Sequence, residues 1–206
     1  AETGPYKGAI TLGYEVSAGE PAFAGFPDLR PEYFQYGLQL PPGTGAIARV
    51  ASQATLAVGA PPDVLLLVAV EQGGRRLDDK WAFVQRKGTQ FEIQAVFPAP
   101  GKYDLVVFAR NAAETGPYKG AITLGYEVSA GEPGFSGFPR TFSTFAESDA
   151  YLYSPLQSSL ALGSTQAFKL SVPKALEVAV VMGDVWVKLP RQGDTYEGPV
   201  TIARTP

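Results

Sequence analysis

The chain has 206 residues, a formal net charge of −3 and neither cysteine nor histidine. Disulfides and thiolate metal sites are therefore excluded, and the side chain that serves most often as general base and as metal ligand is missing. Charged residues make up 18% of the chain, and no basic stretch is longer than two residues, so we expect no nucleic-acid partner.

No apolar run reaches the length of a transmembrane helix, so we expect no insertion into a membrane. Asparagine occurs once, at Asn111, and methionine once, at Met182. This depletion of thermolabile residues, although glutamine is not depleted, is typical of thermostable proteins. The length allows one large domain or two small ones.

Residues 1–21 return without a change at residues 113–133. Self-similarity of this kind indicates a tandem architecture. Each copy contains an alternation that predicts a half-buried strand, with its apolar face formed by Ile10, Leu12, Tyr14 and Val16 in the first copy and by Ile122, Leu124, Tyr126 and Val128 in the second. The second copy closes a predicted domain, whereas the first has no domain in front of it. We call residues 1–18 the orphan strand.

After a proline-rich junction at residues 19–32, the sequence predicts a first full domain over residues 33–129. Glycine and proline recur throughout, and almost no segment has a helical apolar period. The predicted strands cover 33–40, 46–51, 53–58, 63–71, 80–86, 90–97, 103–110 and 119–128. Short strands separated by turns such as Gly73-Gly74 predict an immunoglobulin-like β-sandwich.

The junction is repeated at residues 130–142, and a second domain is predicted over residues 143–206. Its expected strands cover 150–153, 166–172, 175–182, 184–189 and 195–203. When Trp186 and Tyr196 are aligned with Trp81 and Phe91, the first domain continues for two further strands and the second does not. The fold class is therefore predicted as all-β, with tandem immunoglobulin-like sandwiches of which the second lacks its last strands.

Two stretches carry a family resemblance. One is Phe97-Pro-Ala-Pro-Gly101-Lys-Tyr103-Asp-Leu-Val-Val-Phe108, followed by Tyr118 and Gly125-Tyr126-Glu-Val128. The other runs from Ser154-Pro155-Leu156 through Phe168-Lys-Leu-Ser-Val172-Pro173 to Gly193-Asp194-Thr-Tyr196-Glu-Gly198. Together they resemble the Ig-like β-sandwich modules that accompany transglutaminase-like domains of the kyphoscoliosis peptidase type. The resemblance implies an accessory module. It brings no catalytic site, because the peptidase part of such proteins uses a Cys-His-Asp arrangement and this chain has neither cysteine nor histidine.

Charged residues give no strong candidate for a catalytic, metal or cofactor site. Asp78-Asp79 after Arg75-Arg76 is typical of a solvated, charge-compensated loop, and Glu147 with Asp149 supplies too few ligands for Ca²⁺. Two carboxylates could serve a glycosidase, but nothing in the sequence places two acids in one pocket. We therefore expect no enzyme activity, no metal and no cofactor.

The aromatic residues are the better candidates for binding. Trp81 and Trp186 occupy matching places in the two domains, where they either pack in a core or present a stacking platform for sugar rings. Phe23, Phe26, Phe135 and Phe138 lie in the two junctions, where buried aromatic rings would fix the angle between domains.

Three interpretations of the orphan strand remain open. It is the last strand of a preceding identical module, a tail outside any sheet, or a strand that pairs with an open sheet elsewhere. The third has a physical motive, because an unpaired apolar strand promotes aggregation and the second domain lacks strands. Ile10, Leu12, Tyr14 and Val16 would then mediate self-association by donor-strand complementation, although the tail supplies one strand and the domain lacks two.

We therefore expect a non-catalytic structural module of a repetitive extracellular or cell-surface protein. Its expected partners are other copies of itself or neighbouring repeats, and head-to-tail strand complementation would build fibres. The alternative function is an accessory module that binds carbohydrate or protein through the tryptophans.

Overall fold

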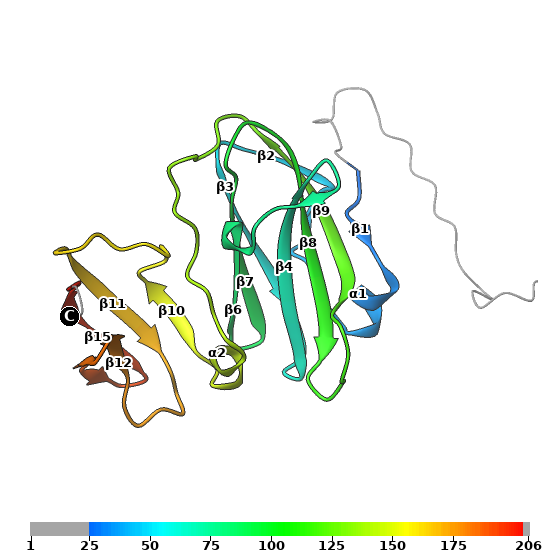
Figure 1. Ribbon diagram of the computed structural model, residues 1–206. Coiled ribbons are helices and arrows are strands. Elements are labelled where there is room, and N and C mark those ends of the chain that lie inside the picture. The colour runs from blue at the N-terminus through cyan, green and yellow to red at the C-terminus, as the bar shows by residue number, and fades with distance from the viewer. Residues whose placement is uncertain (1–24, 204–206) are drawn as a thin grey trace, which may run out of the picture.

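The computed structural model describes residues 25–203, which form two β-rich units joined by a linker (Figure 1). The first unit spans residues 28–128, the linker spans residues 129–142, and the second unit spans residues 143–201. The strands of the first unit are β1 (Asp28–Leu29), β2 (Ile47–Val50), β3 (Gln53–Gly59), β4 (Val64–Gln72), β5 (Arg75–Arg76), β6 (Ala82–Lys87), β7 (Gln90–Val96), β8 (Gly101–Asn111) and β9 (Lys119–Val128). A short helix α1 (Pro31–Gln35) and a 3-10 turn η1 (Asp79–Trp81) complete it.

Two sheets face each other in the first unit. One has the order β1-β9-β8-β4-β5, with β2 added parallel to β9, and the other has the order β3-β7-β6. The alternating strands turn their apolar side chains inward, as a sandwich requires. The aromatic centre of this core is Phe97, which is fully buried and whose ring lies 5.0 Å from that of Tyr103 and 5.3 Å from that of Tyr126.

The strand predicted in the second copy of the repeat is confirmed as β9. Its four predicted apolar residues, Ile122, Leu124, Tyr126 and Val128, are all buried in the core. On its edges β9 pairs with β8 and β1 in antiparallel fashion and with β2 in parallel fashion. It therefore ties the start of the first unit to the end.

The predicted strand over residues 33–40 is wrong. Residues 31–35 form α1, because Pro31 suits the first turn of a helix and Glu32 places a negative charge at its positive end. Gly37 ends the helix with φ of 62°, a left-handed conformation that glycine adopts without strain. Only Gln39 keeps a strand contact, an isolated bridge to Gly59.

The second unit begins with α2 (Ser143–Glu147) and contains β10 (Tyr151–Ser154), β11 (Thr165–Ser171), β12 (Ala179–Met182), β13 (Val185–Lys188), β14 (Arg191–Gln192) and β15 (Thr195–Thr201). One sheet has the order β10-β11-β15-β14, and the other is the hairpin β12-β13. The all-β class and the Ig-like sandwich architecture predicted from the sequence are confirmed, although both units also carry a one-turn helix that the sequence did not suggest.

The start of the second unit repeats the backbone of the first at the same sequence offset as the duplicated stretch. The amide of Ala46 donates to the carbonyl of Gly25 at 2.8 Å, and the amide of Ser158 donates to that of Gly137 at 2.7 Å. The bridge between Gln39 and Gly59 likewise returns as the pair Tyr151 and Ser171. Each residue lies 112 positions after its counterpart (137 for 25, 158 for 46), as residue 113 does after residue 1.

The two units are joined where β10 meets β6 (Figure 1). The side chain of Gln85, only 3% exposed, donates from its amide nitrogen to the carbonyl of Leu152 at 3.1 Å and accepts from the amide of Leu152 at 2.9 Å. The hydroxyl of Tyr151 donates to Glu92 at 2.9 Å. Since a buried amide side chain needs both bonds satisfied, these contacts specify one position of β10 on the first unit.

Aromatic rings fill the rest of this joint. The ring of Phe138 in the linker stacks on that of Phe83 at 5.6 Å, and it meets Phe135 edge-on at 4.9 Å. Phe145 from α2 packs on the other side of Phe83. Phe135 and Phe138 thus lie between the units, where the sequence placed them.

Tyr151 makes the joint sensitive to alkaline pH. Burial and the hydrogen bond to Glu92 raise the pKa of Tyr151 to about 12, whereas an unperturbed tyrosine has a pKa of about 10. The folded state therefore holds this proton more tightly, and the stability that the bond provides is present below pH 10 and lost toward pH 12. Burial also raises the pKa of Tyr126, so the test is a comparison: alkaline titration followed at 295 nm should lose one late-titrating tyrosine in Tyr151→Phe relative to the unmodified chain. A difference spectrum with an ordinary midpoint would contradict the buried bond.

The linker contains a glycine that cannot be replaced and one that can. Gly131 has φ of +80°, and an added Cβ would lie 2.4 Å from the Cα of Ala99, whereas a Cβ on Gly134 meets nothing within 4 Å. We expect Gly131→Ala to destabilise the first unit by about 1–3 kcal/mol and Gly134→Ala to have little effect. Urea unfolding monitored by circular dichroism compares the two variants, and equal midpoints would refute the difference.

Candidate strand-accepting groove

The second unit has an open apolar groove of about 450 Å³ between its two sheets. Its floor is formed by β10 and β11 through Leu152, Phe168 and Leu170. One wall is the end of the linker with α2, including Phe142 and Phe145, and the other wall is the start of β12 with Val180. We call this the strand-accepting groove, for the reason that follows from the first unit.

In the first unit the same surface is covered. The counterparts of Phe168 and Leu170 at the offset of 112 are Leu56 and Val58, which are 7% and 0% exposed. Phe168 and Leu170 themselves are only half-buried. The difference arises because β8 and β9 close the first sandwich, whereas the described part of the second unit has no strand after β15.

The walls of the groove correspond to the elements that lie beside β8 and β9 in the first unit. β9 lies beside β1 and α1 in the first unit, and β8 lies beside β4. The counterpart of α1 is α2, and the counterpart of β4 is β12, which within the described residues pairs only with β13. The groove therefore lies where β8 and β9 would lie in a unit built like the first, and Phe142, which lines it, is 71% exposed.

The predicted site residues are distributed as follows. Ile10, Leu12, Tyr14 and Val16 lie outside the described residues. Trp81 is half-buried beside the joint, with its ring 6.1 Å from that of Phe135. Trp186 is 67% exposed on β13 opposite Val181, whereas the groove side of the hairpin carries Val180. The two tryptophans do not share one site.

Sequence reasoning did not name the residues that line the groove. The sequence predicted a strand over residues 166–172 and a second domain without its last strands. The signal that could have identified the groove was the combination of the two, because an apolar face without its covering strands must be exposed or covered by something else.

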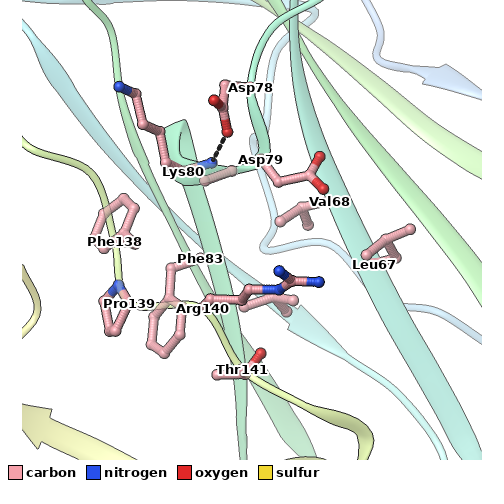
Figure 2. A pocket seen from close by; sticks show the side chains of 12 residues that line it. Leu67, Val68, Asp78, Asp79, Lys80, Phe83, Phe138, Pro139, Arg140 and Thr141 are labelled. Atoms are coloured by element: carbon pink, nitrogen blue, oxygen red, sulfur yellow. Dashed lines mark hydrogen bonds between the residues drawn. The ribbon is translucent and has the colours of Figure 1, made fainter. Parts of the chain in front are cut away.

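A second cavity, of about 590 Å³, lies at the joint (Figure 2). Figure 2 shows Phe83 and Phe138 on one side of it and the loop of Asp78 and Asp79 on the other. The carboxylate of Asp78 accepts from the amide of Lys80 at 3.2 Å, and Asp79 pairs with Arg76 at 2.8 Å. These acids are thus occupied by local bonds, as the sequence suggested for a charge-compensated loop.

Other acidic residues are also paired locally. Asp149 forms an ion pair with Lys174 at 2.7 Å, so it does not combine with Glu147 into a cation site. Within residues 25–203 no three acidic side chains are grouped as metal ligands would be. None of the helices in this part of the chain has the length and apolar character needed to cross a bilayer.

Comparison with solved structures finds chains from structures of titin domains. A complex of titin M10 with obscurin-like 1 Ig is 26% identical over 40% of this chain and 83% of that chain, with a TM-score of 0.23. Titin Z1Z2 in complex with telethonin is 14% identical over 76% of this chain and 77% of that chain, with a TM-score of 0.25. The low TM-scores leave these likenesses without weight.

No curated protein matches the chain. The family model for the KY-like, immunoglobulin-like domain matches residues 21–130, which include the whole first unit. That match agrees with the resemblance found in the sequence and with the two-sheet architecture. Domains of this kind typically serve as accessory or structural modules. The chain belongs to the KY-like, immunoglobulin-like domain family.

Proposed function

We propose that the chain is a non-catalytic structural module of a repetitive extracellular or cell-surface protein, and that it assembles head to tail by strand complementation. The orphan strand of one copy, with Ile10, Leu12, Tyr14 and Val16, enters the strand-accepting groove of the next. The observation that carries this proposal is the groove itself, an Ig-like core left open where β8 and β9 close the first unit.

The orphan strand carries apolar side chains that would cover the apolar surface of the groove. Its sequence is that of β9, whose four apolar residues Ile122, Leu124, Tyr126 and Val128 are at most 6% exposed in the first unit. Full burial of an apolar side chain of this size contributes about 1.5–3 kcal/mol. Main-chain hydrogen bonds along the strand add affinity, while the ordering of a free segment opposes it.

The contact joins different surfaces of the two copies, the orphan strand of one and the second unit of the other. Such a heterologous contact leaves a free strand at one end and a free groove at the other, so it propagates unless the geometry closes a ring. Fibres or rings of variable length are the expected assemblies. Their growth depends on concentration.

Size exclusion with light scattering tests the assembly. The full chain should form concentration-dependent oligomers, and a chain without residues 1–18 should remain a monomer. A double substitution Leu12→Asp with Tyr14→Asp, on the predicted apolar face, should weaken association at least tenfold. The matched control is Glu15→Lys on the opposite face, which should associate as the full chain does, because the counterpart Glu127 pairs with Arg49 and the second unit has Ala161 at that place.

Two results would overturn the proposal. A full chain that remains monomeric at all accessible concentrations removes complementation altogether. Oligomers that persist without residues 1–18 show that another surface associates. The double substitution leaves β9 itself unchanged, so a loss of association cannot be attributed to unfolding of the first unit.

One observation favours a second function, the binding of carbohydrate. Trp186 is 67% exposed opposite the exposed Val181, and together they make an apolar surface on the outside of the β12-β13 hairpin. Sugar rings stack on such surfaces. In Trp81→Phe the remaining tryptophan reports on this site alone, and cellohexaose or chitohexaose should protect its fluorescence from acrylamide quenching. Unchanged quenching with both sugars excludes the platform.

A further inference from the structure

We infer that the incoming orphan strand takes the place of β9 beside α2 and the linker, and does not extend the free edge of β12. This inference rests on the proposed function and assigns the register of the bound strand. Its basis is the constant offset of 112 positions that relates residues 25–59 to residues 137–171 and residues 1–21 to residues 113–133.

The first set of contacts comes from β1. In the first unit Asp28 lies opposite Thr123, Leu29 lies opposite Ile122, and the amide of Arg30 donates to the carbonyl of Ala121 at 3.0 Å. The counterparts of these three residues are Arg140, Thr141 and Phe142, which border the groove. With the same offset, Arg140 lies opposite Thr11, Thr141 lies opposite Ile10, and the amide of Phe142 faces the carbonyl of Ala9.

The second set of contacts comes from residues before β2 and from β2 itself. The amide of Gly125 donates to the carbonyl of Ala46 at 2.7 Å, and β2 then runs parallel to β9. Ser158, the counterpart of Ala46, already holds the matching bond to Gly137. The amide of Gly13 would donate to Ser158, and residues 159–162 would run beside residues 13–16.

This close approach favours glycine in the incoming strand. A Cβ on Gly125 would lie 3.3 Å from the carbonyl oxygen of Ala46 and 3.3 Å from Cγ1 of Ile47. The orphan strand has Gly13 at this position. The edge of β12 makes no such demand. The matching edge of β4 is occupied by β8, whose residues Asp104 through Asn111 pair with it in direct register. The sequence of β8 differs from that of the orphan strand.

The connection after the strand favours a second copy over the same chain. In the first unit β9 completes the sandwich, and the chain then continues through the linker into the next unit. A strand of this kind therefore completes the unit before the one that follows it in the chain. Residues 17–24 repeat residues 129–136 with two changes, Ala22 for Gly134 and Ala24 for Ser136. The space around Gly134 accommodates a methyl group, and Ser136 bonds Ser158 through its carbonyl only. The orphan strand therefore belongs in a unit that precedes its own first unit, and the second unit of another copy is such a unit.

Disulfide trapping tests this register. The chain has no cysteine, so introduced thiols are the only ones, and directly opposed strand residues are close enough to be bridged. A Thr11→Cys chain mixed with an Arg140→Cys chain should give a crosslinked dimer on mild oxidation. Mixing Thr11→Cys with Val181→Cys, on the edge strand β12, should give at least tenfold less. Asp28→Cys with Thr123→Cys in one chain is the positive control for the same pair inside the first unit.

The outcomes separate this inference from the proposed function. Preferred crosslinking to Val181→Cys places the strand on β12, which overturns the register but preserves complementation. Absence of both crosslinks in a chain that still needs residues 1–18 to oligomerise overturns the register as well. A Thr11→Cys, Arg140→Cys double variant that closes within a monomer overturns the second copy as donor. Monomeric chains throughout refute the proposed function itself.

Discussion

The structure depends on the closure of one sheet over another by β9. This strand buries Ile122, Leu124, Tyr126 and Val128 against the facing sheet, and its edges bind both β8 and the N-terminal elements β1 and β2. A sandwich buries its core only when both sheets are present. In the described part of the second unit no strand follows β15, and the floor of its groove, Phe168 and Leu170, is only half-buried.

The sequence allowed most of the β architecture to be predicted, because strands with one buried face alternate visibly. The pattern of β9 followed from alternation, and the expected shortage of two strands in the second domain came from aligning its residues with those of the first. The one-turn helix α1 could not be seen in this way. Tyr36 and Leu38 are buried as the predicted strand 33–40 required, but Pro31, Glu32 and Gly37 determine a local conformation that apolar spacing does not report.

The site was less predictable than the fold. Trp81 and Trp186 match in sequence, yet one packs beside the joint and the other is exposed, since the exposure of a side chain depends on what covers it. The joint between the units depends on Gln85, whose role no local pattern reveals: its two bonds are to the backbone of Leu152, 67 residues further along the chain. Long-range polar contacts of this kind become visible only in three dimensions.

The hydrogen-bonded contact that joins the two units of one chain cannot form again between the second unit and another copy. Arg191 pairs with Tyr196 in the second unit as Arg86 pairs with Phe91 in the first, so the two arginines are counterparts. Pro190 therefore stands in the second unit where Gln85 stands in the first. A proline ring cannot form the two hydrogen bonds that Gln85 forms with Leu152. In the proposed assembly, the contact between copies would therefore lack the Gln85 hydrogen bonds and would depend on the strand in the groove.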